Sequence, residues 1–162
     1  MTQHLADLAA SGPAALYDLL AQRLKEKPGF DLLTVLAPND AGDRLIRLYS
    51  SNHDQYPLGD ADIVHDDAWF RKLFTAKEAV VANDGEEIRQ WLPDFVEYVE
   101  MGYGSLLNLP IVIAGEAIGI LNVMAGRGHF SPEAVKAIGE QAPLAGLAVL
   151  ARDAGHRRVA FR

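Results

Sequence analysis

The sequence predicts an α+β domain in which a central antiparallel β-sheet is covered on both of its faces. Its 162 residues correspond to about one domain, with a core large enough to fold without disulfides or metal ions. A strong hairpin at residues 105–124 is apolar on both faces of its second strand, which puts that strand mid-sheet between two layers. Helical patterns of apolar residues lie near both ends of the chain and can cover such a sheet.

The first clear helix is expected at about residues 13–27. Ser11 can cap its free backbone amides, and Pro13 suits its first turn. Pro28 and Gly29 end the pattern. The apolar side chains of this helix recur at helical spacing and form one stripe: Leu16, Leu19, Leu20 and Leu24.

A first hairpin is predicted after this helix. Residues 31–37 and 44–50 have the composition of strands, and the segment between them is dense in turn-forming residues. Residues 51–66 are expected to form a long loop, and loops of that length are often functional. Three further elements are expected: a short helix at 67–74, a strand at 79–82 and a helix at 86–98 that Pro93 interrupts.

The second hairpin pairs residues 106–113 with residues 117–124 across a short turn. Because side chains alternate along a strand, its second strand presents one set of apolar residues to each face. Ile118, Ile120 and Met124 are predicted on one face. Ala117, Leu121 and Val123 are predicted on the other.

A long C-terminal helix is expected to begin at Ser131 and Pro132 and to kink at Pro143. It carries a heptad-like seam formed by Val135, Ile138, Ala142, Ala145 and Val149. This helix is either buried within its own domain or shared between its sheet and a partner subunit, and we favour the second interpretation. The predicted homodimer interface therefore consists of that seam together with Leu16 and Leu20. The basic segment 152–162 is expected to be a solvated tail.

Composition excludes several classes of function. The net charge of −7 disfavours a duplex nucleic acid as partner, because the surface repels phosphate. The chain has no cysteine, which excludes thiol nucleophiles, thiol-based zinc sites and thioether-linked chromophores. The beginning of the chain does not have the pattern of a signal peptide, and no uninterrupted apolar run is long enough to span a membrane. A cytoplasmic location is expected.

No catalytic motif stands out. Gly102 and Gly104 begin like a dinucleotide-binding loop, but the third glycine is missing and a strand follows. The histidines are not spaced as metal ligands on one element, so a metal site through His53, His65 and nearby aspartates is a minor alternative. No catalytic residue, metal ion or cofactor is predicted.

Two asparagines in the most apolar strands are more informative. Asn108 and Asn122 are expected to lie within about one residue of each other across the second hairpin. A buried side-chain amide needs hydrogen-bond partners. They either satisfy backbone groups or provide polar contacts in a ligand pocket. Aromatic residues gather in the middle of the chain and can form apolar walls of such a pocket. The predicted ligand-binding residues are Tyr49, Ser51, Tyr56, Trp69, Trp91, Phe95, Asn108 and Asn122.

The order of these elements and the segment 106–123 resemble the GAF domain family, a sensory module of cyclic-nucleotide phosphodiesterases, adenylyl cyclases, phytochromes and many bacterial regulators. The resemblance is clearest in the run from Leu106 to Val123, which holds Asn108 and Pro110, the hairpin turn and the sequence Gly-Ile-Leu-Asn. Segments 49–52 and 56–59 and Trp69 are similar to a bacterial branch of the family. The similarity spans about residues 14–150.

The resemblance implies a GAF-like, PAS/profilin-like antiparallel sheet of about six strands. The terminal helices would pack on one face, and loops and short helices would cover a pocket on the other. It also implies dimerisation through the terminal helices.

Departures from the family's patterns narrow the function. Bilin-binding members and the free methionine sulfoxide reductases of this fold react through cysteine, which this chain lacks. Cyclic-nucleotide-binding members carry an Asn-Lys pair, whereas Asn83 is followed here by Asp84. We therefore expect a non-catalytic domain that senses an unidentified small molecule as a homodimer. The alternative is a scaffold that uses the fold only to dimerise or to bind another protein.

Overall fold

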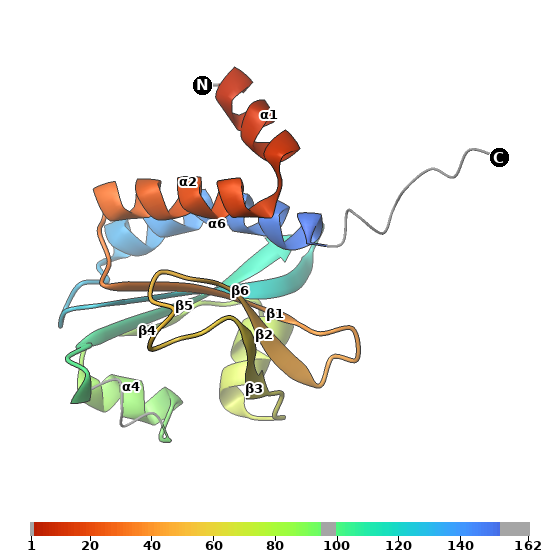
Figure 1. Ribbon diagram of the computed structural model, residues 1–162. Coiled ribbons are helices and arrows are strands. Elements are labelled where there is room, and N and C mark those ends of the chain that lie inside the picture. Colours follow the sequence, from red (N-terminus) through yellow and green to blue (C-terminus); the bar gives the residue numbers. More distant parts are fainter. Residues whose placement is uncertain (1, 95–99, 153–162) are drawn as a thin grey trace.

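The computed structural model describes residues 2–94 and 100–152 and consists of one six-stranded antiparallel sheet between two layers (Figure 1). The strand order is β3-β2-β1-β6-β5-β4, and every neighbouring pair is antiparallel. The strands are β1 (Leu32–Pro38), β2 (Arg44–Ser50), β3 (Gly59–Ile63), β4 (Val80–Ala82), β5 (Ser105–Ile113) and β6 (Glu116–Ala125). The helices are α1 (Thr2–Ser11), α2 (Pro13–Glu26), α3 (Ala68–Phe70), the π-helix η1 (Arg71–Thr75), α4 (Gly85–Trp91) and α6 (Pro132–Ala151). The predicted α+β fold is confirmed.

Strand β6 lies at the centre of the sheet, between β1 and β5. Leu121 and Val123 pack into the cluster beneath the long helices, whereas Ile120 and Met124 pack into clusters on the opposite face. The prediction that this strand is apolar on both faces and covered on both is therefore confirmed.

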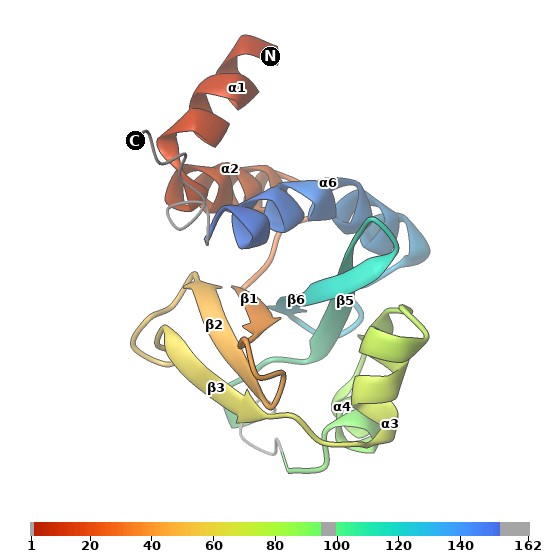
Figure 2. The same cartoon turned by 90° about the vertical axis from the view of Figure 1, so that its right-hand side faces the viewer.

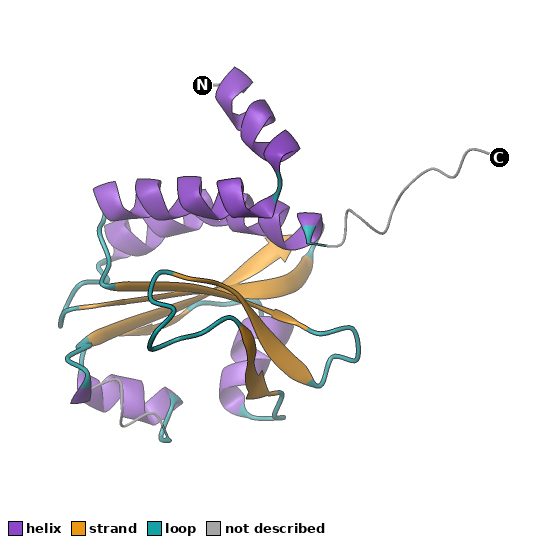
Figure 3. Ribbon diagram, viewed as in Figure 1, coloured by secondary structure: helices purple, strands orange, loops and turns teal. Residues whose placement is uncertain are grey.

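Helices α2 and α6 lie side by side over one face of the sheet (Figures 1, 2 and 3). Ser131 caps α6 by accepting a hydrogen bond from the Ala134 amide. The helix continues through Pro143 as one element of 20 residues. In the described part of the chain, α6 is the one helix long and apolar enough to cross a membrane, and 39% of its most apolar 18-residue window is buried inside the domain.

The burial of α6 corrects the predicted dimer interface. Leu16, Leu20, Ile138 and Ala145 have no exposed surface, and Val149 is 3% exposed. These five residues pack in the domain's own core, so the prediction that they face a partner subunit is wrong. Val135 and Ala142 of the same seam are half-buried. The seam is the inner face of α6, because an apolar stripe on a helix packs first against the sheet of its own chain.

A bulge in the second hairpin alters one predicted face. The β5–β6 register shifts between Ile111 and Val112, which pair with Gly119 and Ala117 and leave Ile118 without an opposite residue. Ile118 packs against the helix-side cluster, not with Ile120 and Met124 as expected. An inserted residue changes the alternation of side chains from that point.

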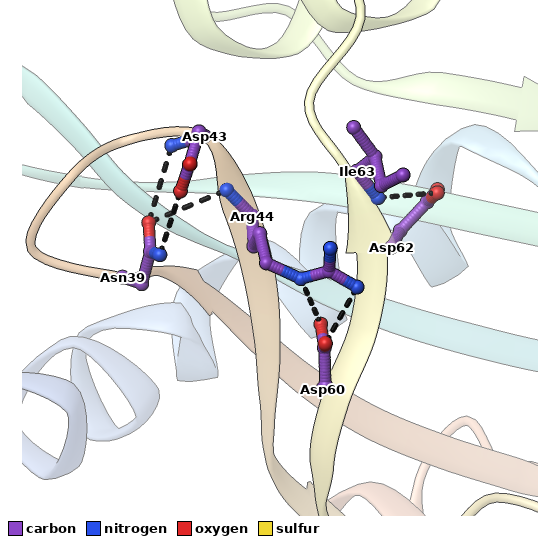
Figure 4. Close-up of polar contacts among 6 residues, drawn as sticks. All are labelled: Asn39, Asp43, Arg44, Asp60, Asp62 and Ile63. Carbon is purple, nitrogen blue, oxygen red and sulfur yellow. Dashed lines mark hydrogen bonds and ion pairs between the residues drawn. The ribbon is translucent and has the colours of Figure 1, made fainter.

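The segment predicted as a loop at 51–66 contains the edge strand β3. Two of the five residues of β3 are aspartates, which are depleted in strands. Because of this composition, the sequence pattern did not predict the strand. Pairing with β2 holds it in place, and Arg44 of β2 donates from Nε to Asp60 Oδ1 at 2.7 Å (Figure 4). At the preceding turn, Asn39 accepts hydrogen bonds from the amides of Asp43 and Arg44.

The layer opposite α2 and α6 is formed by α3, η1, α4 and the segments that connect them (Figure 2). Asp67 caps the short helical segment by accepting from the Phe70 amide at 2.9 Å. Helix α4 ends at Trp91, two residues before Pro93, so the predicted interruption occurs there. The remainder of the helix expected to residue 98 falls largely outside the described residues.

Candidate functional site

A small cavity lies on the face of the sheet opposite α2 and α6. Its volume is about 60 Å³. Its walls come from β1, β2, β3, β5 and β6, together with Trp69 of α3 and Leu92 after α4. Most of the lining is apolar and consists of Leu32, Leu36, Tyr56, Ala61, Trp69, Leu92, Leu106 and Met124. Polar side chains also line it: Thr34, Arg47, Asp62, Asn108 and Asn122.

Three of these polar residues occupy one row across the sheet. Thr34 of β1 pairs in register with Asn122 of β6, and Asn122 pairs with Asn108 of β5. Asn108 donates from Nδ2 to Asn122 Oδ1 at 2.7 Å, and Asn122 donates from Nδ2 to Thr34 Oγ1 at 3.2 Å. The predicted juxtaposition of the two asparagines is thus present, and the partners of each amide are side chains.

Trp69 sets the direction of this row. Its indole Nε1 can only donate, and it donates to Asn108 Oδ1 at 2.9 Å. Because Oδ1 of Asn108 faces the indole, Nδ2 of Asn108 faces Asn122 and donates to Asn122 Oδ1. Nδ2 of Asn122 then faces Thr34 and donates to Thr34 Oγ1. We call Trp69, Asn108, Asn122 and Thr34 the polar row. It divides the apolar side chains of this face into two clusters.

Arg47 lines the side of the cavity formed by β2. Its Nη1 donates to the carbonyl oxygen of Pro57 at 2.9 Å, and its guanidinium carbon lies 5.4 Å from the centre of the Tyr56 ring. Its Nε is buried and has no hydrogen-bond partner among residues 2–94 and 100–152. The prediction missed Arg47, although it lies two residues after the buried Leu45 and so on the same face of β2.

Four of the eight predicted ligand-binding residues line the cavity: Tyr56, Trp69, Asn108 and Asn122. Trp91 does not line it. This residue packs beside the cluster that contains Trp69, with the Lys72 ammonium 5.8 Å from its ring centre. Phe95 lies outside the described residues.

Tyr49 and Ser51 are not in the cavity either. The β1–β2 register shifts between Val35 and Leu36, so that Leu48 and Tyr49 both pack on the helix side. There the Tyr49 ring stacks on Tyr17 with a centroid separation of 5.3 Å. Ser51 is exposed, and its Oγ accepts from the Leu33 amide, which extends the pairing of the two strands.

The ionisable groups with perturbed pKa values lie outside the cavity. Burial raises the pKa of Tyr17 to about 12 on the helix side. A hydrogen bond from Arg71 lowers the pKa of Asp66 at the exposed edge of the other layer. Within the described ranges, no three His, Asp or Glu side chains are grouped as metal ligands, and His53 and His65 are both exposed. The arrangement offers hydrogen bonds and apolar walls, which suit binding.

Comparisons with solved structures show the same fold in domains of a phosphotransferase, a putative sensor histidine kinase and a chemotaxis protein. The GAF domain of a phosphoenolpyruvate-protein phosphotransferase from Acinetobacter is 15% identical, with a TM-score of 0.68 over 95% of this chain and 94% of that one. A domain of a putative two-component sensor histidine kinase from Sinorhizobium meliloti 1021 is 16% identical, with a TM-score of 0.63 over 89% and 96%.

Residues 122 to 287 of a methyl-accepting chemotaxis protein are 20% identical to this chain, with a TM-score of 0.64 over 92% and 95% of the two chains. The search of curated proteins found no significant match. The family model described as GAF domain matches residues 10–149, which is most of the sequence and includes every described residue of the cavity. The chain therefore belongs to the GAF domain family.

Proposed function

We propose that this GAF domain is a non-catalytic signalling domain that senses a small molecule bound in the cavity beneath α3 and α4. The observation that carries the proposal is the polar row, which crosses the base of a cavity whose lining is mostly apolar. Placing hydrogen-bonding amides in the middle of a core costs stability, and binding sites are where such exceptions concentrate. An apolar pocket with a few placed polar groups is the usual form of a small-molecule site.

The relatives support a signalling role. Structures with this fold include domains of a methyl-accepting chemotaxis protein and of sensor histidine kinases. In this signalling role, binding of the ligand changes the state of a partner protein or of the domain's own dimer. The domain itself catalyses no reaction. We expect it to act in the cytoplasm.

A thermal-shift screen of metabolites tests the proposal with a variant that fills the cavity. Ala61 lines the cavity from β3, and Ala61→Leu adds bulk there while leaving the polar row intact. Ala14→Leu is the matched control, because Ala14 is exposed on α2 in the opposite layer. A ligand at a hundredfold excess over its dissociation constant stabilises the folded state by about 2.7 kcal/mol. Hits retained by Ala14→Leu and lost by Ala61→Leu support the proposal, and hits unaffected by Ala61→Leu contradict it.

A second candidate function is a scaffold that dimerises or binds another protein without a ligand. Its support is apolar surface on the outward side of the helical layer, where Leu147 is 40% exposed and Leu150 is 50% exposed. We propose that a homodimer, in either function, uses this outward side of α6 in place of the buried seam. Light scattering of the wild type and of the double variant Leu147→Gln, Leu150→Gln tests this dimer interface. The wild type should be dimeric and the double variant monomeric. A wild-type monomer would contradict the dimer.

A further inference from the structure

A second hollow lies on the same side of the sheet as the cavity and shares no lining residue with it. Its volume is about 500 Å³, and we call it the outer groove. Asp66 and Arg71 line the outer groove and form an ion pair with each other, so their charges balance. Its apolar walls come from β1, β2, the segment after β3, α3 and η1: Pro38, Leu45, Val64, Phe70 and Phe74.

The helical side of the outer groove is aromatic. The rings of Phe70 and Phe74 are nearly parallel, with an interplanar angle of 18° and centroids 6.1 Å apart. Phe74 is only half-buried, and Thr75 next to it is exposed. Apolar surface bordered by polar residues is typical of interaction sites. Because aromatic rings pair favourably at centroid separations of about 4.5–7 Å, the outer groove suits an aromatic side chain.

Two aspartates contact the walls of the outer groove. The carbonyl oxygen of Asp43 accepts a hydrogen bond from the Val64 amide at 2.9 Å. The carboxylate of Asp67 accepts from the Phe70 amide at 2.9 Å. None of the described cationic side chains lies within ion-pair distance of either carboxylate. The border of the groove therefore favours an occupant that carries positive charge.

The C-terminal segment 153–162 follows directly on a residue that contacts the outer groove. Arg152, the last described residue, donates from Nη2 to the carbonyl oxygen of Pro38 at 3.1 Å, and Pro38 lines the groove. Residues 153–162 lie outside the described residues, and their sequence contains three arginines, one aspartate and Phe161. Phe161 comes nine residues after Arg152, and an extended chain of that length spans up to about 30 Å. The segment is long enough to place Phe161 in the groove.

We propose that the outer groove binds this chain's own C-terminal segment, with the Phe161 ring beside Phe70 and Phe74 and its arginines near Asp43 and Asp67. Exposed ion pairs contribute little singly, so the ring contact provides most of the affinity. A short tether gives an effective concentration in the millimolar range, so a weak contact suffices. The segment is thus a docked element in place of the solvated tail expected from the sequence. This inference is independent of the ligand proposed for the cavity.

Paramagnetic relaxation in the full chain tests the docking. Because the chain has no cysteine, Arg162→Cys creates a single attachment site for a nitroxide spin label. The expected result in the ¹⁵N-labelled protein is loss of the Val64 and Thr75 amide signals, which return when the nitroxide is reduced. Both of these residues line the outer groove.

Variants of the segment separate docking from mere proximity. Phe161→Ser in the same spin-labelled chain should restore the two signals, because it removes the ring. Phe161→Leu is the matched control: it keeps an apolar side chain and should keep most of the signal loss. The double variant Arg157→Gln, Arg158→Gln should restore the signals in part. All of these positions lie outside the family match at residues 10–149, so the fold should be unaffected.

Three outcomes would overturn the inference. Amide signals that persist in the first spin-labelled chain would mean that the segment does not dock. Equal signal loss with and without the Phe161 ring would mean that the tether alone brings the label near. The third outcome comes from a mixture of unlabelled ¹⁵N chain with spin-labelled chain of natural isotope content: signal loss there would assign the groove to the segment of a second copy. The metabolite screen tests the proposed function separately.

Discussion

The two faces of the sheet are built differently. Beneath α2 and α6, one continuous apolar cluster joins both helices to residues from β1, β5 and β6. On the opposite face, the polar row separates two smaller clusters, and the cavity lies between them. The helix-side face provides most of the apolar burial. The cavity face buries less apolar surface, because hydrogen-bonding groups and open volume take the place of apolar side chains. We therefore expect mutations on the helix-side face to affect mainly stability, and mutations on the cavity face to affect mainly binding.

The largest difference should come from truncating one leucine on each face. Leu20 of α2 is fully buried in the continuous cluster, whereas Leu36 of β1 is 7% exposed and borders the cavity. Leu20→Ala should destabilise the protein by about 3–5 kcal/mol and Leu36→Ala by about 2 kcal/mol, because Leu36 already lacks neighbours on one side. Chemical denaturation measures both values. Equal losses would mean that the two faces are packed alike.

A smaller effect is expected from breaking the polar row. Asn108→Leu leaves the Trp69 indole and the Asn122 amide without their partners and should cost about 1–3 kcal/mol. Trp69→Phe removes the indole donor, so the double variant should lose less than the sum of the two single losses. A double-mutant cycle of unfolding free energies measures this coupling. Strict additivity would contradict the direct link between Trp69 and Asn108.

The smallest effect at neutral pH is expected at Tyr17, on the helix-side face. Its buried hydroxyl has no partner among the described residues, so Tyr17→Phe should leave stability at pH 7 unchanged or slightly higher. Burial raises the pKa of Tyr17 from 10.0 to about 12, so the folded protein holds the phenol proton more tightly than the unfolded chain does. This contribution is complete below about pH 10 and is lost as the pH rises towards 12.

Across that range, the wild type should lose about 2 kcal/mol more than Tyr17→Phe does. Unfolding midpoints measured at pH 9 and at pH 11.5 for both proteins give the difference. The Tyr17 assignment is wrong if the two proteins lose the same amount.

The fold could be predicted because the patterns that set it are local. Apolar periodicity marks α2, α6 and both hairpins, and turn residues mark their ends. The site could be predicted only in part. Asn108, Asn122 and Trp69 stand out by chemistry, whereas the bulge that turns Tyr49 to the helix side depends on pairing between strands. Strand β3 could not be predicted for the same reason. Its aspartates are unfavourable for a strand, and the strand is stabilised by its pairing with β2.

The two edges of the sheet have a consequence for behaviour in concentrated solution. An unpaired strand edge is a template on which other chains can add and aggregate. Strand β4 has three residues, and the exposed edge strand β3 carries Asp60 and Asp62. Charged side chains on an edge strand disfavour the addition of another strand, and a strand of three residues offers few backbone groups for such pairing. We therefore expect the molecule to resist fibril growth.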